Sequence, residues 1–437
     1  MNGTKKIATL AIFILICVLR LPPFTYTNAE ITIQSSDNTP PLGALVVPDQ
    51  YSTIQAAIGN ATAGDTVFVK EGIYLTFNLE INKPIQLIGQ TPKKTILDGG
   101  GYINVNRETI VISSSNVRIS GFTIVNSHEA IVTRSSNQLK GIIISGNYII
   151  NSSLGIRASN TILITENSIL NNDFGIEMSS AGSVISSNVI TNNRRGISID
   201  GADNLTISGN IIANNSFGVS LNLVSNVDIY CNNITGSLGF DRVENRYKSG
   251  IVFNGYCNNS LVHDNIIGQN SNGIDLTNIL LVGATSNINL PQGYGNLIYR
   301  NNFLNNTYNG NVEHSYPWLD AYQELKNLYK DVTSNINGTA IVSWDNGTVG
   351  NYWSDYQIKY PNATEVDASG IGDTVYVIDE NNVDYHPLMH QVKITVDEQP
   401  PMQSSRIHIL SIVAVVIILI VLISLIIIKK KKLINKR

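Results

Sequence analysis

The amino-acid sequence predicts an all-β fold in which the chain coils into a parallel β-helix, and three observations carry this prediction. One pattern returns four times between residues 142 and 222 with a period of 20–22 residues, which indicates a repeat architecture. Apolar and polar residues mostly alternate within each repeat and isoleucine dominates, as in short strands with one buried face. No apolar period of about 3.6 residues is found in this stretch, so helical repeats are disfavoured.

The repeats share a register that is counted from one asparagine in each coil, here called position zero. These asparagines are Asn147, Asn167, Asn188 and Asn210. A glycine recurs at plus eight, and the glycines are Gly155, Gly175, Gly196 and Gly218. We expect the stacked asparagine amides to hydrogen-bond along the solenoid axis, and each glycine to need a positive φ or a close approach of two backbones.

The asparagine register continues after the fourth repeat, but its spacing stretches from 22 to 33 and 36 residues. It passes through Asn232, Asn265 and Asn301. Two inserts explain the longer spacing, one at about 237–246 in a turn and one at about 279–294 after a strand. Long loops on a rigid scaffold are where binding residues usually lie.

The two ends of the chain carry export and membrane signals. Lys5 and Lys6 precede an apolar run, and a small-residue cleavage site ends at Ala29, so a signal peptide is expected. Residues 409–428 are an uncharged run of 20 that is long enough for a membrane helix, and four lysines follow it. Because positive charge marks the cytoplasmic side, we expect a single-pass protein of the cell membrane with an extracellular or periplasmic ectodomain and a cytoplasmic C-terminus.

The sequence is accordingly divided into seven parts. They are a signal peptide at 1–29, a spacer at 30–44, the β-helix at 45–343, a closing segment at 344–392, a juxtamembrane linker at 393–408, the membrane helix at 409–428 and a basic tail at 429–437. A short amphipathic helix from Thr53 to Ile58 is expected to cap the open first coil. A helix at 319–330 and a strand at 339–344 are expected to close the far end.

The charge of the expected ectodomain limits its partners. Residues 30–408 hold 20 basic residues and all 33 acidic ones, a net charge of −13. An acidic surface argues against nucleic acid as a partner, and weakly against polyanionic glycans.

Two cysteines, Cys231 and Cys257, remain after the expected signal peptide. Their places in the register differ by seven residues, up to ~20 Å along the coil, whereas a disulfide needs about 5.5 Å between Cα atoms. We therefore expect two free thiols.

Ten N-x-[ST] sequons follow the expected signal peptide. Glycosylation requires an accessible asparagine, so sequons in loops and turns are the better acceptors. Asn151 and Asn214 lie at plus four in the repeat, where we expect ladder residues and therefore poor acceptors.

Two stretches near the C-terminus resemble the closing signature of NosD-like proteins. They read "WDNGTVGNYWSDY" at 344–356 and "GIGDTVYVIDENNVDYHPLM" at 370–389. Together with the repeats and the "YSTIQAAI" cap, the resemblance covers about residues 45–390. It implies a right-handed parallel β-helix, related to the pectin-lyase-like solenoids of carbohydrate-binding and sugar-cleaving proteins. Named NosD proteins assist the maturation of a copper site in nitrous oxide reductase.

The chain departs from the NosD-like pattern at one place. An Asp/Gly-rich stretch commonly precedes "GIGDT" in the family, whereas this chain has "YPNATEVDAS" at 360–369. The resemblance therefore lends less support to a bound cation such as calcium in that loop.

Outward-facing residues at plus ten and plus twelve are expected to stack on one sheet face. They include Arg157, Glu177, Asp200, Asn222 and Asp275. β-Helix polysaccharide enzymes place acid and base carboxylates on such a face, so Glu177, Asp200 and Asp275 are weak catalytic candidates. For Glu177, an ion pair with Arg157 is the simpler interpretation.

The segment "HPLMH" offers His386, Met389 and His390, whose side chains suit copper. The segment also belongs to the closing signature, where leucine and methionine are expected to plug the end of the coil. These three residues are weak metal candidates, and copper and calcium are both left open as cofactors.

The favoured function is non-enzymatic recognition of glycans or of neighbouring surface components. A polysaccharide lyase or hydrolase that acts on the outward sheet face is one alternative. A copper-handling accessory protein is the other. The identity of the ligand and of any protein partner is left undetermined.

Overall fold

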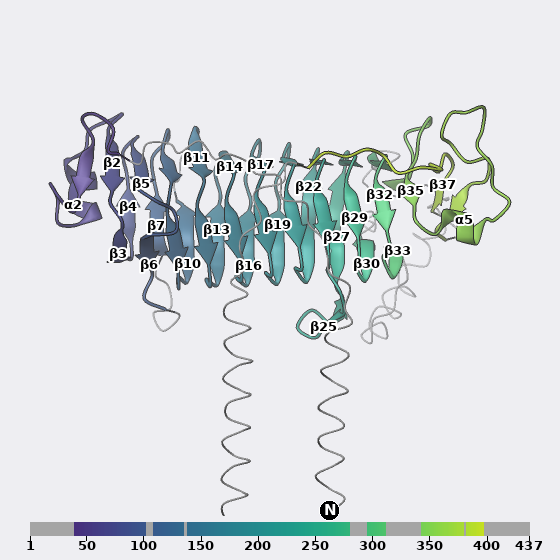
Figure 1. Ribbon diagram of the computed structural model, residues 1–437, viewed down its shortest axis with the longest axis horizontal. Helices are drawn as coiled ribbons and strands as arrows, with labels where there is room; N and C mark the ends of the chain where they lie inside the picture. The colour runs from purple at the N-terminus through teal and green to yellow at the C-terminus, as the bar shows by residue number, and fades with distance from the viewer. Residues whose placement is uncertain are drawn as a thin grey trace, which may run out of the picture. The chain divides into compact units, whose positions relative to one another are not determined.

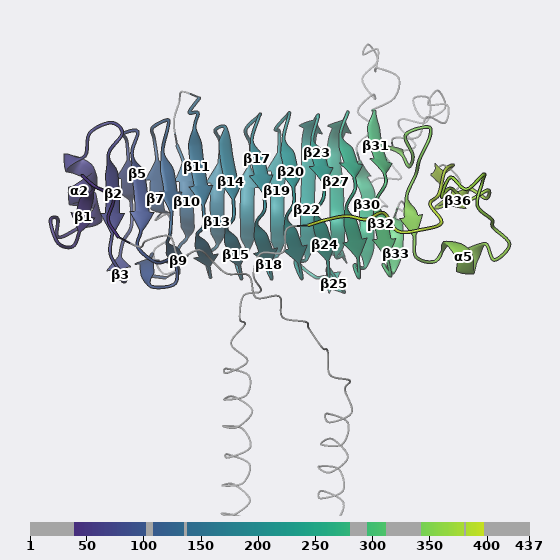
Figure 2. The same ribbon diagram turned by 45° about the horizontal axis from the view of Figure 1, so that its top comes forward.

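The computed structural model of the protein describes residues 39–101, 108–134, 138–279, 295–311, 342–379 and 382–396. They form a solenoid in which each regular coil adds one strand to each of three parallel sheets. In Figure 1 the coils lie side by side along the long axis, and the colour changes steadily from α2 to β37. In the turned view of Figure 2 the strands of different sheets lie one behind another. The parallel β-helix that the repeat predicts is confirmed.

The three sheets are named A, B and C. Sheet A contains β1 (Leu45–Val47), β2 (Thr66–Val69), β5 (Gln86–Gly89), β8 (Arg118–Ser120), β11 (Ile142–Ser145), β14 (Ile162–Thr165), β17 (Val184–Ser186), β20 (Thr206–Ser208), β23 (Asp228–Tyr230), β28 (Leu261–His263), β31 (Asn296–Tyr299) and β34 (Val342–Ser343). Sheet B contains β3 (Gly72–Leu75), β6 (Thr95–Asp98), β9 (Thr123–Val125), β12 (Tyr148–Ile150), β15 (Ser168–Leu170), β18 (Val189–Thr191), β21 (Ile211–Ala213), β24 (Asn233–Thr235), β29 (Ile266–Gly268), β32 (Asn302–Leu304) and β35 (Tyr352–Trp353). Sheet C contains β4 (Leu79–Ile81), β7 (Glu108–Ile112), β10 (Glu129–Thr133), β13 (Leu154–Ala158), β16 (Phe174–Met178), β19 (Arg195–Asp200), β22 (Phe217–Ser225), β27 (Ser249–Asn258), β30 (Asn272–Ile279) and β33 (Tyr308–Asn311).

Two antiparallel hairpins and two helices complete the described elements. They are β25 (Phe240–Asp241) with β26 (Arg246–Tyr247), β36 (Tyr376–Val377) with β37 (Val383–Asp384), α2 (Ile54–Asn60) and α5 (Tyr356–Lys359). Helix α2 is the predicted cap: Thr53 Oγ1 accepts a hydrogen bond from Ala56 N over 3.1 Å, and Ile54, Ala57 and Ile58 are buried. The buried residues close the first coil, because an open coil end would expose core and strand edges.

The interior of the solenoid is filled by aliphatic side chains that stack on their counterparts in neighbouring coils. Ile164, Ile169 and Ile176 face inward from the three sheets of one coil and are completely buried. They pair in register with Ile185, Ile190 and Ile197 of the next coil. Burying one such side chain contributes roughly 1.5–3 kcal/mol, so a coil is stable only between neighbours that complete its core.

A row of buried asparagines at position zero confirms the predicted ladder. The backbone N and side-chain Nδ2 of Asn188 lie 2.9 and 3.0 Å from Asn210 Oδ1, and both donate to it. The same Nδ2 donates to the carbonyl oxygens of Ile164 and Ser186, at 2.9 Å each. The row contains Asn147, Asn167, Asn188, Asn210, Asn232, Asn265, Asn301 and Asn351. Because each amide also needs partners in the neighbouring coils, the row holds those coils in register.

The ladder ends on a different residue at each side. Phe122 occupies position zero in the coil before Asn147, and its backbone N donates to Asn147 Oδ1 over 3.1 Å. At the far end, Asn351 N and Trp353 Nε1 donate to Asp384 Oδ2 over 2.7 and 2.8 Å. Burial raises the pKa of the Asp384 carboxyl to about 7, against these hydrogen bonds, which lower it.

A second ladder lies at plus five, and the prediction that the plus-four asparagines are ladder residues is wrong. Asn172 N donates to Asn193 Oδ1, and Asn193 N to Asn215 Oδ1, both over 2.9 Å. The plus-four residues Asn151 and Asn214 are exposed and have φ of 52° and 57°. Asparagine tolerates this left-handed conformation better than most residues, so it turns the chain there and leaves the buried position to its successor.

Of the two reasons expected for glycine at plus eight, the structure shows the close approach of two backbones and not a positive φ. A Cβ atom on Gly196 would lie 2.6 Å from the carbonyl oxygen of Gly218, and one on Gly175 would lie 2.6 Å from that of Gly196. Neither glycine has a positive φ. Any larger residue would push adjacent coils apart, which explains why glycine recurs at this position.

The closing segment completes the solenoid. It supplies β35, the last strand of sheet B, and the last ladder residue, Asn351. The Trp353 ring stacks on Phe303 at 4.4 Å and on Tyr376 at 4.3 Å between centroids. These stacked rings cover the end of the core, beyond the last described strands of sheets A and B.

Several expectations lie outside the described residues. They are the signal peptide at 1–29, the insert at about 279–294 apart from its first residue, the helix at 319–330, the membrane helix at 409–428 and the basic tail at 429–437. No helix of the described part of the chain is long and apolar enough to cross a membrane. Cys231 and Cys257 are free cysteines, as predicted from their register.

We expect Asn188→Ala to lower the free energy of unfolding more than Asn222→Ala does. Removing the buried Asn188 amide leaves polar groups of two coils without partners, at roughly 1–3 kcal/mol. The Asn222 amide donates to Asp200 Oδ1 at the surface over 2.7 Å, where water can replace it. Thermal unfolding followed by circular dichroism measures both, and equal shifts in Tm would contradict the structural role of the ladder.

The raised pKa of Asp384 predicts a pH-dependent stability. Between about pH 4 and about pH 7 the folded state holds a proton that the unfolded state has released, so this group lowers the free energy of unfolding as pH rises through that window. The variant Asp384→Asn should lack this contribution. Urea unfolding of both proteins across the window measures the difference, and a difference that does not change with pH would refute the assignment.

Candidate functional site

A groove of about 770 Å³ lies on the outer face of sheet C, over its first four strands. Its lining is polar and charged apart from one valine. The lining residues are Asn78, Glu80, Glu108, Val111, Ser113, His128, Glu129, Arg134 and Arg157. Acidic, basic and amide groups therefore meet in one concave surface, whereas most small-molecule sites are lined mainly by apolar side chains.

Two stacked glutamates form the floor of the groove. Glu108 begins β7 and Glu129 begins β10, and the two residues are directly paired in the parallel register. Neighbouring strands lie about 4.8 Å apart, so the two carboxylates are close. They are only 6% and 5% exposed. Two like charges in this position destabilise a sheet unless other charges compensate them.

Two arginines provide the compensation. Arg134 Nη2 pairs with Glu108 Oε1, and Arg157 Nη1 pairs with Glu129 Oε1. Arg157 also reaches Glu177 Oε2 over 3.3 Å. Both arginines are themselves partly exposed, with 58% and 43% of their side chains accessible. Each ion pair thus joins a buried carboxylate to a guanidinium that faces the groove.

Three buried polar atoms of the groove have no hydrogen-bond partner among the residues that the structure describes. They are Glu129 Oε2, Arg157 Nε and His128 Nδ1. Buried polar groups are nearly always hydrogen-bonded, and each exception calls for a physical reason. One acceptor and one donor on the same ion pair, next to an imidazole nitrogen, form a set that a hydroxylated ligand can satisfy.

The three carboxylates predicted as catalytic candidates lie in three different environments. Glu177 is in the ion pair with Arg157, beside the groove. Asp200 is exposed and accepts a hydrogen bond from Asn222. Asp275 alternates with the core residues Ile274 and Leu276 and so lies on the outer face as expected, but it is only 1% exposed. The structure brings none of the three into a pair with another of the three.

The burial of Asp275 results from the first predicted insert. Residues 237–246 contain most of the β25–β26 hairpin, and Arg246 of this hairpin pairs with Asp275 Oδ2 over 2.6 Å. The same guanidinium lies 5.2 Å above the Phe217 ring. Glu244 of the hairpin pairs with Arg195 of β19 over 2.6 Å. The hairpin therefore covers the middle of sheet C and uses Asp275 as an anchor.

Sequence reasoning missed Glu108 and Glu129, although a signal was present. The two glutamates are 21 residues apart, one repeat period, and each begins a sheet C strand and is followed by a small residue and an isoleucine. A carboxylate at one register position in successive coils must stack. The early coils are irregular in sequence, and their register becomes evident only from the strand pairing.

The metal candidates of the closing segment also lie in different surroundings. His386 Nδ1 is 3.2 Å from Asp345 Oδ1. Met389 is partly buried and packs against the core at the end of the solenoid. His390 is exposed. Among the residues that the structure describes, no group of three or more His, Cys, Asp and Glu side chains could hold a metal ion.

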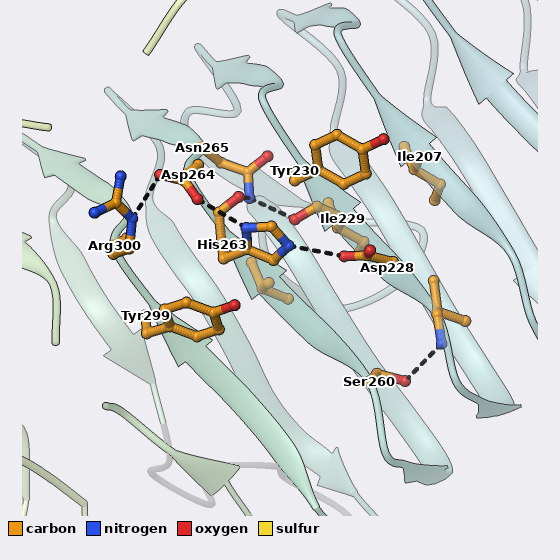
Figure 3. Close-up of polar contacts among 12 residues, drawn as sticks. Ile207, Asp228, Ile229, Tyr230, Ser260, His263, Asp264, Asn265, Tyr299 and Arg300 are labelled. Carbon is orange, nitrogen blue, oxygen red and sulfur yellow. Dashed lines mark hydrogen bonds and ion pairs between the residues drawn. The ribbon is translucent and has the colours of Figure 1, made fainter. Parts of the chain in front are cut away.

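A second polar cluster lies on sheet A and is shown in Figure 3. The His263 ring is stacked between the rings of Tyr230 and Tyr299, with centroids 5.4 and 5.2 Å away. Its Nε2 is 3.1 Å from Asp228 Oδ1 and its Nδ1 is 2.8 Å from Asp264 Oδ2. Both nitrogens and both faces of the imidazole are occupied, so we interpret the cluster as a side-chain ladder that stabilises the sheet.

With the fold and the groove described, the chain can be compared with known proteins. The family model described as "Periplasmic copper-binding protein (NosD)" matches residues 58–239 and 139–358, which is more than half of the chain. The chain belongs to the NosD family. This confirms the resemblance that the repeats and the closing segment show. No curated protein sequence matches the chain.

Several solved structures are similar to this NosD-family chain at low identity. A pectate lyase, Pel9A, is 13% identical with a TM-score of 0.43, over 81% of this chain and 84% of its own. The A-module of the mannuronan C-5 epimerase AlgE4 from Azotobacter vinelandii is 14% identical with a TM-score of 0.39, over 63% and 96%. An alginate lyase from Paenibacillus sp. str. FPU-7 is 12% identical with a TM-score of 0.37, over 59% and 93%.

The position of Asp275 predicts that its replacement changes stability. Asp275→Asn and Arg246→Met should each cost roughly 3–5 kcal/mol, because each leaves one buried charge without its partner. The double variant should cost less than the sum of the two single changes. Chemical unfolding of the three proteins measures this coupling, and strictly additive costs would show that the ion pair does not anchor the hairpin.

Proposed function

We propose that this NosD-family protein recognises a neutral glycan in the groove on sheet C, without cleaving it. The observation that carries the proposal is a set of three buried atoms in one groove, Glu129 Oε2, Arg157 Nε and His128 Nδ1, for which the described part of the chain supplies no hydrogen-bond partner. A sugar hydroxyl both donates and accepts hydrogen bonds. It can therefore donate to the glutamate and accept from the arginine at the same time.

The charge of the groove favours a neutral ligand over a polyuronate. Glu80, Glu108 and Glu129 line it, against Arg134 and Arg157. Both arginines are already paired with the buried glutamates. An incoming carboxylate would have to displace a glutamate and leave it buried without a partner, which is costly. The net charge of −13 expected for the ectodomain also favours a neutral ligand over a polyuronate.

The ion pairs also favour recognition over cleavage. A glycosidase needs one carboxyl group as a proton donor and a second as nucleophile or base. Glu108 and Glu129 each have an oxygen that contacts an arginine, so neither can transfer a proton from that oxygen while its ion pair persists.

Hydrolysis is the second candidate, and one observation supports it. Glu108 and Glu129 are a stacked pair of buried carboxylates in a groove. Most glycoside hydrolases use two carboxyl groups for catalysis. A ligand that drew Arg134 or Arg157 away from its glutamate would free the corresponding oxygen. This candidate uses the same groove, and assays for new reducing ends separate it from recognition.

A copper-handling role, which the family description suggests, has less support in this chain. The His386, Met389 and His390 side chains have different surroundings, and Met389 contributes to the core at the end of the solenoid. This donor set does not fit a single copper site, which needs its ligands around one point. We therefore assign no role to copper or to calcium.

We place the groove outside the cytoplasm. The family is described as periplasmic, and the sequence carries the expected signal peptide and the expected membrane helix at 409–428. A protein anchored in this way would meet surface glycans or cell-wall components, which are the partners that the proposal requires.

The proposal predicts binding that depends on the groove charges. The double variant Glu129→Gln with Arg157→Gln removes both charges of one pair, so that no single charge stays buried. It should bind a neutral polysaccharide at least about tenfold more weakly, since a charged hydrogen bond contributes ~1.5–3 kcal/mol. Calorimetric titration of the full chain with soluble glucan, mannan and arabinogalactan measures the affinity.

The matched control is Asp200→Asn, a change of one carboxylate on sheet C outside the groove lining. It should bind as the unchanged protein does. No binding to any of the three polymers, or equal binding by the double variant, would refute recognition in the groove. If the unchanged protein generates new reducing ends and Glu108→Gln does not, the groove hydrolyses the glycan and the proposal of recognition without cleavage is wrong.

A further inference from the structure

Nine of the ten N-x-[ST] sequons lie in the part of the chain that the structure describes. Their asparagines are Asn60, Asn151, Asn204, Asn214, Asn233, Asn258, Asn305, Asn346 and Asn362. A sequon is an acceptor of N-linked oligosaccharide only where it lies on the surface. The asparagine amide is the group that is modified, and the hydroxyl of the third residue completes the motif. The fold therefore separates these nine sequons by the surroundings of both groups.

Three of the sequons share one turn geometry and are called the turn sequons below. Asn151, Asn204 and Asn305 are exposed and have φ of 52°, 55° and 51°. Asparagine adopts this left-handed conformation more readily than most residues. The structure shows no hydrogen bond from any of these three side-chain amides to another described residue. Their Nδ2 atoms therefore face solvent at the corners of the solenoid.

The middle residue of each turn sequon is fixed to the solenoid. Ser152 and Leu205 are 0% and 1% exposed, and Asn306 Oδ1 accepts a hydrogen bond from the backbone N of Asn270 over 3.0 Å. Because the middle residue is held, the residues on either side of it are directed outward. The third residues are at least partly exposed, and their hydroxyls make no hydrogen bond to another described residue; they are Ser153, Thr206 and Thr307.

Four other exposed sequons have a polar group that is already used within the fold. Asn60 Nδ2 donates to the carbonyl oxygen of Ala56 over 2.9 Å, and Asn346 Oδ1 accepts from Thr348 Oγ1 over 2.8 Å. In the other two the hydroxyl is bound to a carboxylate, and these pairs are Ser216 with Asp241 and Thr364 with Asp373. Each of these contacts would have to break before the whole motif is presented.

The last two described sequons belong to strands of the solenoid. Asn233 begins β24 and Asn258 ends β27. The side-chain amide oxygens of both are buried. An N-linked oligosaccharide is bulky and solvated, so it could be attached there only by displacing the groups that cover these amides.

We propose that the three turn sequons carry N-linked oligosaccharides in the exported protein. The donor is an oligosaccharide that is joined through its anomeric carbon to a pyrophosphate. The asparagine Nδ2 forms a bond to that carbon, and the bond between the carbon and the pyrophosphate oxygen breaks with its electron pair on the oxygen. Nδ2 gives up one proton to solvent. The modification does not depend on the groove on sheet C, but it requires the export that the N-terminal signal predicts.

The fold removes the reason for which Asn151 was expected to be a poor acceptor. The second ladder runs through the next residue, where Ser152 N donates to Asn172 Oδ1 over 2.9 Å. The Asn151 amide takes no part in it. Modification of a turn sequon therefore breaks no hydrogen bond of the described chain, and the glycosylated protein should unfold at the same Tm as the enzymatically deglycosylated one.

Mass spectrometry of peptides tests the proposal on the full chain isolated from the membranes of its natural host. Peptides that contain Asn151, Asn204 or Asn305 should carry oligosaccharide masses. Peptides that contain Asn233 or Asn258 should be unmodified, and they serve as controls within the same molecule.

Three single variants remove one turn sequon each while they keep the asparagine. They are Ser153→Ala, Thr206→Ala and Thr307→Ala. Each variant should lose one oligosaccharide and gain electrophoretic mobility by one step, and the triple variant should migrate as the enzymatically deglycosylated protein does. Because the replaced side chains lie at the surface, the variants should fold as the unchanged protein does.

The matched gain variant is Asp173→Ser, which completes a sequon at Asn171. Asn171 is exposed and has φ of 58°, and its successor Asn172 is fixed in the second ladder. The Arg194 guanidinium loses its contact with Asp173 but keeps Glu244 as a partner. This variant should gain one oligosaccharide, which peptides containing Asn171 would show.

Two results would overturn the proposal. One is the absence of oligosaccharide from all three turn sequons in the protein of the natural host. The other is modification of Asn233 or Asn258 as complete as that of the turn sequons, which would show that the turn geometry does not select the sites.

Discussion

The interaction on which this structure depends is the hydrogen bond from one asparagine amide to the next along the solenoid. Every asparagine at position zero uses its donors and its oxygen within its own and the neighbouring coils, as Asn188 does with Asn210 and Ile164. A shift of one coil by one residue would leave these buried amides unsatisfied and turn its isoleucines outward. The ladder therefore makes the register of the coils an all-or-none property.

A fixed register turns the chain into rows of residues about 4.8 Å apart. Inward rows become the isoleucine stacks, and the glycine row allows the backbones to approach. Outward rows bring together residues that are one repeat apart in the sequence, such as Glu108 with Glu129 and Tyr230 with His263. A few substitutions along a row can thus gather charged or aromatic side chains on one sheet face without a separate loop.

Two segments outside the regular coils, the β25–β26 hairpin and the closing segment, add contacts that the stacked rows do not provide. The β25–β26 hairpin brings Glu244 and Arg246 onto sheet C and leaves its rings exposed. The closing segment ends the ladder on Asp384 and the core on stacked aromatic rings. Both elements are anchored by buried charged groups, whose contacts require one particular geometry. The coils are joined by apolar stacking, which can be repeated from coil to coil.

The sequence by itself determined the parallel β-helix, its asparagine ladder, its cap and the place of the first insert, because each depends on local patterns that repeat within one coil. The sequence placed the second ladder at plus four, whereas it lies at plus five. Either residue of an Asn-Asn pair could face inward, and only the backbone conformation decides between Asn171 and Asn172. The tertiary structure alone revealed the groove and the burial of Asp275. Those features depend on which irregular coils pair in register and on where a hairpin folds back, and both are set by contacts between residues distant in the chain.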